Sequence, residues 1–162
     1  MISELQQEAA TTRRVLERVP ADKLSWAPHP KSMTLGQLAY HVAKIPGDLC
    51  GDLAPLEGFD ASQANFSPPS PASLDEILAA HDASIATASA YLGALTPEAA
   101  AAPWRLTNKD AEVFTIPRSG LLRSILLNHW YHHRGQLSVY LRLLDVPVPV
   151  IYGRSADENP FE

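Results

Sequence analysis

Apolar residues recur every three or four positions in four separate stretches of the chain, which is the spacing of an amphipathic α-helix. The first stretch is Ser3–Val19 and the fourth is the long run Ser119–Leu144. The second begins at Thr34 and the third at Ser73, and each of these residues is followed three positions later by Gln or Glu. This is a capping-box pattern, which marks a helix start. The pattern therefore predicts four helices, each with one buried face.

The connections between these stretches refine the predicted topology. The segment Asp52–Pro71 is rich in Pro, Ser and Ala and is longer than a hairpin of helices needs, so we expect a crossover with the third helix parallel to the second. Trp104–Leu106 and Glu112–Ile116 are expected to pair as a small hairpin, and an extended tail covers 145–162. The predicted fold class is all-α: a four-helix bundle with a long crossover linker, in one domain spanning 1–162.

Composition and charge exclude several functional classes. Of the 162 residues, 46% are hydrophobic and 19% are charged, as in an ordinary globular protein. The net charge of −5 argues against nucleic acid as a partner, because no basic stripe is present to neutralise phosphates. No apolar run approaches the ~20 residues of a membrane span. The single cysteine, Cys50, excludes an internal disulfide, and with no signal-like N-terminus it favours a cytoplasmic location.

Three histidines stand out on the predicted inward faces. His129 and His133 are four positions apart, so both imidazoles leave the same face of the fourth helix, and His41 points inward from the second. Three imidazoles suit Zn, Ni or Fe and leave one coordination position open, as catalytic sites do. Two interpretations stay open: the histidines share one divalent metal ion, or they are polar core residues with other partners.

Other polar residues are expected near this group. His81 lies at a similar depth to His41 if their helices are parallel, so it is a candidate for the pocket. Gln136 faces inward and can orient a ligand or touch substrate, whereas His132 lies at the edge of the stripe. Arg134 points away from the histidines, which suggests an ion pair at the surface or at a dimer interface.

The order of these motifs resembles the DinB/YfiT-like superfamily. The segments that carry the resemblance are Leu35-Gly36-Gln37-Leu38-Ala39-Tyr40-His41-Val42, His129-Trp130-Tyr131-His132-His133-Arg134-Gly135-Gln136-Leu137 and Pro149-Val150-Ile151-Tyr152-Gly153. The resemblance covers nearly the whole chain. It implies an up-down-down-up helix order, a homodimer, and a divalent metal held by His41, His129 and His133. Some members are thiol-dependent S-transferases or isomerases that use bacillithiol or mycothiol.

Two functions are compatible with this sequence. In the first, a metal-dependent enzyme activates a low-molecular-weight thiol, or water, for attack on a small electrophilic substrate. In the alternative, the protein is a non-catalytic metal-binding stress-response bundle with a structural or sensory ion. A structural site would need a fourth protein ligand, and His81 is the candidate for it.

Overall fold

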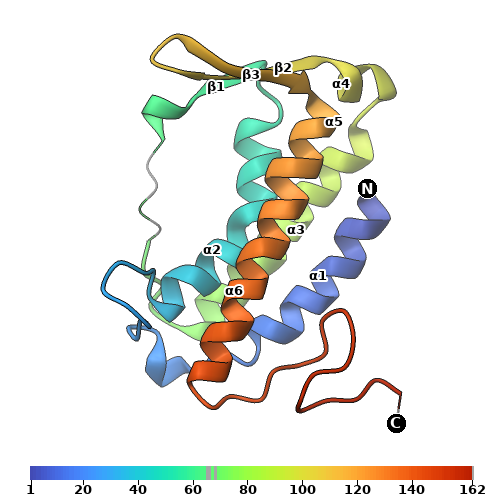
Figure 1. The fold of residues 1–162 in the computed structure, drawn as a ribbon. Helices are drawn as coiled ribbons and strands as arrows, with labels where there is room; N and C mark the ends of the chain where they lie inside the picture. The colour runs from blue at the N-terminus through green and yellow to red at the C-terminus, as the bar shows by residue number, and fades with distance from the viewer. Residues whose placement is uncertain (65–66, 68, 162) are drawn as a thin grey trace.

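The fold contains four long helices, shown in Figure 1. The computed structural model describes residues 1–64, 67 and 69–161. The long helices are α1 (Ile2–Leu16), α2 (Leu35–Asp48), α3 (Leu74–Ala94) and α6 (His129–Leu143). The shorter elements are η1 (Ala21–Lys23), the π-helical segment η2 (Leu49–Leu53), η3 (Ala61–Gln63), α4 (Pro97–Ala101), α5 (Arg118–Leu121) and the π-helical segment η4 (Leu122–Asn128).

The prediction of an all-α four-helix bundle is wrong, because the connections also build a three-stranded mixed sheet with the order β1-β2-β3. The chain is therefore an α/β protein. The strands are β1 (Gly58–Asp60), β2 (Pro103–Asn108) and β3 (Ala111–Pro117). In Figure 1 the sheet lies at the top, at the end of the molecule that also holds α4 and α5.

The predicted hairpin is present, with longer strands than expected. β2 and β3 pair antiparallel around Lys109 and Asp110, whose φ angles of 50° and 68° fit the tight turn of a hairpin. The strand β1, which was not predicted, pairs parallel with β2. A Cβ atom at Gly58 would lie 2.4 Å from the carbonyl oxygen of Arg105, so this approach requires glycine.

Helices α2 and α3 run in one direction and α1 and α6 run in the other (Figure 1). Gly47 of α2 lies against Ser84 of α3, where an added Cβ would be 2.7 Å from the Ser84 Cα. The Ser84 hydroxyl accepts a hydrogen bond from the Gly47 amide at 2.7 Å and donates one to the Lys44 carbonyl at 3.2 Å. This contact fixes α3 along α2, while α1 and α6 cover the remaining sides of the core.

The predicted capping box at Thr34 is present, whereas Ser73 caps its helix without the return bond, because the Glu76 side chain accepts from the Ala72 amide instead. Thr34 accepts from the Gln37 amide and Gln37 returns the bond, while Ser73 accepts from the Glu76 amide. The core between the helices is apolar, with Leu35, Leu38 and Val42 fully buried, for example. Within the part of the chain that the structure describes, no helix is long and apolar enough to cross a membrane.

Candidate metal centre

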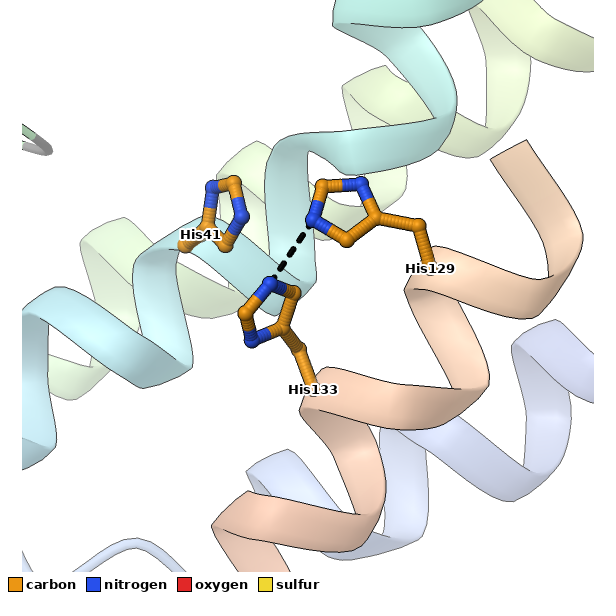
Figure 2. A group of neighbouring side chains, drawn as sticks. All are labelled: His41, His129 and His133. Carbon is orange, nitrogen blue, oxygen red and sulfur yellow. Dashed lines mark hydrogen bonds between the residues drawn. The ribbon is translucent and has the colours of Figure 1, made fainter. Parts of the chain in front are cut away.

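His41, His129 and His133 come together between α2 and α6, as Figure 2 shows. One ring nitrogen of each lies within 4.8 Å of those of the other two. The ring centroid of His41 is 5.3 Å from that of His129 and 4.6 Å from that of His133. Nitrogens this close can be ligands of a single metal ion. The three residues nominated from the sequence therefore form one cluster.

The cluster lies at the edge of the core, which differs from its expected place on the core-facing stripe. The buried residues of α6 are Trp130, Arg134, Leu137 and Leu141, whereas His129 and His133 are half-buried. A half-buried position leaves part of each of these residues accessible from solvent. Such access is what a binding or catalytic site requires.

Pro46 sets the register between α2 and α6 next to the cluster. Proline has no amide hydrogen, so it cannot bond the carbonyl four residues earlier, that of Val42. The indole Nε1 of the buried Trp130 donates to this carbonyl at 2.8 Å. Because Val42 follows His41 and Trp130 follows His129, the bond holds the histidines of the two helices opposite each other. Helix α2 continues through Pro46 to Asp48.

Trp130 was not among the residues predicted from the sequence to lie at the site. Two signals were available in the chain. A proline inside a helix leaves one carbonyl without its helical donor, and a buried tryptophan needs an acceptor for its N–H. Their pairing required the knowledge that α2 and α6 are neighbours, which periodicity does not provide.

His129 and His133 point their Nε2 atoms at each other. These atoms are 2.7 Å apart, and the dashed line in Figure 2 joins them. The Nδ1 of His133 is 2.7 Å from the Gln136 Oε1, and the His129 ring bonds the backbone of Ile125. A ring that donates from Nδ1 keeps a lone pair on Nε2 when it is neutral. Two converging lone pairs repel each other unless a cation or a shared proton lies between them.

Burial keeps these histidines neutral at pH 7. It lowers the pKa of His41 to about 4, with further lowering from the nearby His133 and His129. Burial also lowers the pKa of His129 and of His133, against smaller opposing effects from their hydrogen bonds. Neutral imidazole is the form that binds metal ions. The protein environment therefore supplies the three nitrogens in the state in which they can be ligands.

The other pocket candidates lie in different surroundings. Gln136 is exposed and its side chain contacts His133. His132 is exposed and its ring centroid is 4.9 Å from that of His133, but it is not part of the cluster. His81 is buried and also lies outside the cluster, and the charged groups that act on it are Asp82, Arg13 and Glu17. Of these three described residues, Gln136 alone is hydrogen-bonded to a member of the cluster.

His81 is buried without hydrogen-bond partners among the described residues. Its Nδ1 is 3.5 Å from the Asp82 Oδ1, and burial lowers its pKa more strongly than this contact raises it. Because the folded-state pKa lies below the unfolded value of 6.5, the neutral ring contributes its full stability above pH 6.5. That contribution is lost as the pH falls from 6.5 toward the lower folded-state pKa.

We expect the substitution His81→Leu to stabilise the protein by about 1 kcal/mol at pH 7, because it removes two unpaired buried nitrogens. We also expect a smaller loss of stability between pH 6.5 and 5, since one protonation site is removed. Urea unfolding at pH 7 and pH 5 measures both effects. His29→Leu, in an exposed loop, is the control. Equal pH dependence in wild type and His81→Leu would contradict the expectation.

Arg134 forms the expected ion pair, but the expected place at the surface or at a dimer interface was wrong, because its side chain is buried within the chain and is only 1% exposed. Arg134 pairs with Glu8 of α1 at 2.6 Å and donates to the Thr12 hydroxyl at 3.0 Å. The face of α6 opposite the histidines is therefore covered by α1. Arg134 has a structural role in packing α1 against α6.

The fold and the cluster define a class of protein that combines a small mixed sheet with four long helices and gathers three histidines from two antiparallel helices. The chain belongs to the DinB family, whose family model matches residues 1–160. The resemblance predicted from the motifs is thereby confirmed.

Relatives and solved structures agree with this assignment. The Bacillus subtilis (strain 168) protein named "Uncharacterized protein YrdA" is 28% identical over 157 residues, covering 93% of this chain and 85% of that protein. A DinB-like protein from Bacillus cereus ATCC 10987 has a TM-score of 0.68 at 25% identity, covering 93% of this chain and 94% of the other. A DinB-like protein, YjoA, from Bacillus subtilis has a TM-score of 0.65 at 18% identity, covering 94% and 98%, which supports the fold alone.

Proposed function

We propose that this protein binds one divalent metal ion through His41, His129 and His133, and that it is a metal-dependent enzyme. In this proposal it activates a low-molecular-weight thiol, or water, for attack on a small electrophile. The observation that carries the proposal is the convergence of the Nε2 atoms of His129 and His133 at 2.7 Å, with the His133 Nδ1 at 2.7 Å from the Gln136 Oε1. A cation between the two lone pairs would remove their repulsion.

The donor set fits a Lewis-acid centre. Three neutral imidazoles suit Zn, Ni or Fe and leave the charge of a divalent ion uncompensated. A divalent ion in such a site lowers the pKa of a thiol or water molecule that it binds. The chain's own contribution is to hold three nitrogens in place and to leave part of each histidine accessible from solvent.

Two observations favour an external thiol over water, or over the protein's own cysteine, as the nucleophile. Among the described residues, the cluster includes no carboxylate that could serve as a general base for water. Burial raises the pKa of the Cys50 thiol to about 12, so the protein's own cysteine stays protonated at pH 7. An external thiol needs no protein base, because coordination itself favours the thiolate.

The alternative, a structural or sensory ion, requires a closed site. Structural zinc sites normally have four protein ligands. Within residues 1–64, 67 and 69–161, no fourth histidine, cysteine or carboxylate joins the three, and His81 lies outside the group. This favours the catalytic proposal. The homodimer, the cytoplasmic location and the small-molecule substrate stay predictions.

Cobalt(II) tests both parts of the proposal, because it binds at nitrogen sites of this kind and its absorption reports on its ligands. We expect wild type to bind one equivalent. Added cysteine, bacillithiol or mycothiol should then produce thiolate-to-cobalt charge-transfer absorption. His133→Ala should lose most of its cobalt binding, and His132→Ala, the neighbouring exposed histidine, should keep it.

The outcomes separate the two parts of the proposal. Equal cobalt binding by wild type and His133→Ala would contradict the three-histidine site. Cobalt binding without a spectral response to any thiol would contradict thiol activation and leave water as the nucleophile. A thiol response that disappears in His133→Ala supports the whole proposal.

A further inference from the structure

We propose that Gln136 is a positioning residue of the candidate metal centre, which fixes the His133 ring with its Nε2 directed at the ion. This inference rests on the proposed metal site. It adds a role for a side chain that is not itself a ligand, and the role follows from one contact and from the exposure of the residue.

The contact has the geometry of a strong hydrogen bond. Gln136 lies three positions after His133 on α6, so the two side chains are neighbours on the helix surface. The Gln136 Oε1 is 2.7 Å from the His133 Nδ1. With the amide oxygen as acceptor, Nδ1 carries the proton and Nε2 keeps its lone pair. The bond therefore selects both the tautomer and the orientation of the ring.

Gln136 contributes little to the packing of the fold. The residue is exposed, and the contact with His133 is the hydrogen bond that the structure gives its side chain. A residue that mainly filled space would be buried among apolar neighbours. Replacing Gln136 should therefore change the His133 ring much more than the stability of the protein.

His129 is oriented in a different way, by the backbone of the π-helical segment η4 that precedes it. In a regular α-helix the amide of residue 129 would bond the carbonyl of residue 125. Here the His129 amide bonds the Leu126 carbonyl instead, and the backbone of Ile125 bonds the His129 ring. One ligand is thus held by the backbone and the other by a side chain. The contact from the Gln136 side chain is the one that a substitution can remove.

Without an acceptor at Nδ1, the His133 ring can carry its proton on either nitrogen and can rotate about its side-chain bonds. Both changes take the Nε2 lone pair away from the ion. Loss of such a supporting hydrogen bond typically costs roughly 10- to 100-fold in metal affinity. The same range is expected for Gln136→Met, which keeps the length of the side chain and removes the acceptor.

The test is a chelator competition for zinc, with wild type, Gln136→Met, Gln136→Glu and Gln6→Met. We expect roughly 10- to 100-fold weaker binding for Gln136→Met and near wild-type binding for Gln136→Glu, which restores an acceptor. Gln6 is exposed on α1, so Gln6→Met is the matched control. Nitrogen NMR of the metal-free His133 ring should show the Nδ1–H tautomer in wild type and lose this preference in Gln136→Met.

The outcomes distinguish this inference from the proposed function. If wild type binds zinc and Gln136→Met binds it within twofold, Gln136 is not a positioning residue and the metal site stands. If wild type itself binds no zinc, the proposed function fails and this inference fails with it. Weaker binding by Gln136→Met with unchanged urea unfolding, and rescue by Gln136→Glu, supports the inference.

Discussion

Replacing Arg134 by methionine is expected to lower the free energy of unfolding by about 3–5 kcal/mol, because it leaves the Glu8 carboxylate buried without its cation. The Arg134 guanidinium is 1% exposed and the Glu8 side chain 10% exposed. Arg134 also donates to the Tyr152 hydroxyl at 2.5 Å, and Tyr152 in turn donates to Glu8 at 3.0 Å. A single substitution therefore disrupts a network that joins α1, α6 and the C-terminal tail.

A double-mutant cycle separates the pair from the packing around it. Urea unfolding of Arg134→Met, Glu8→Met and the double variant gives the coupling energy. We expect the double variant to be more stable than Arg134→Met alone, since both buried charges are then absent. A loss below about 1 kcal/mol for Arg134→Met would contradict a buried ion pair, because losses of this size are typical of exposed pairs.

Zinc is expected to stabilise the folded protein by about 4 kcal/mol when its free concentration is 1,000 times the dissociation constant. For a chain of 162 residues this corresponds to a rise in Tm of roughly 8–16 °C. His41→Phe should lose this response, because His41 is the one member of the cluster on α2. The two remaining histidines both lie on α6, so an ion bound to them would not link α6 to α2.

Thermal unfolding at increasing zinc concentrations measures this effect. His132→Phe is the control, because His132 is an exposed neighbour of His133 that lies outside the cluster. The expectation is contradicted if the Tm of wild type does not rise with zinc, or if the Tm of His41→Phe rises as much. A rise in wild type and in His132→Phe alone agrees with an ion held between α2 and α6.

Local sequence signals predicted the helices and the candidate cluster. The N-caps at Thr34 and Ser73 act within one helical turn, so the sequence is sufficient to locate them. The four-residue spacing of His129 and His133 also needs no tertiary information. The helical spacing after Thr34 suggested His41 as their partner, the family motifs agreed, and the structure places the three rings together.

Features that depend on distant partners could not be predicted in the same way. The strand β1 is three residues long and pairs with β2, far away in the sequence, so alternation could not reveal it and the predicted fold class was wrong. The direction of Arg134 on the helical wheel was clear, but only the position of α1 shows that this side is buried. His81 shares the α3 stripe with core residues, yet the charged groups that act on it include Arg13 of α1 and Glu17, which follows α1, and it lies outside the cluster.

The bond from Trp130 to the Val42 carbonyl also bears on how an ion would enter the protein. It fixes α2 against α6 through protein groups alone, beside His41 and His129. The three histidines of the proposed site are therefore assembled without an ion, unlike the ligands of zinc fingers, which fold only on binding metal. Uptake and release of the proposed ion would then require no refolding of the chain.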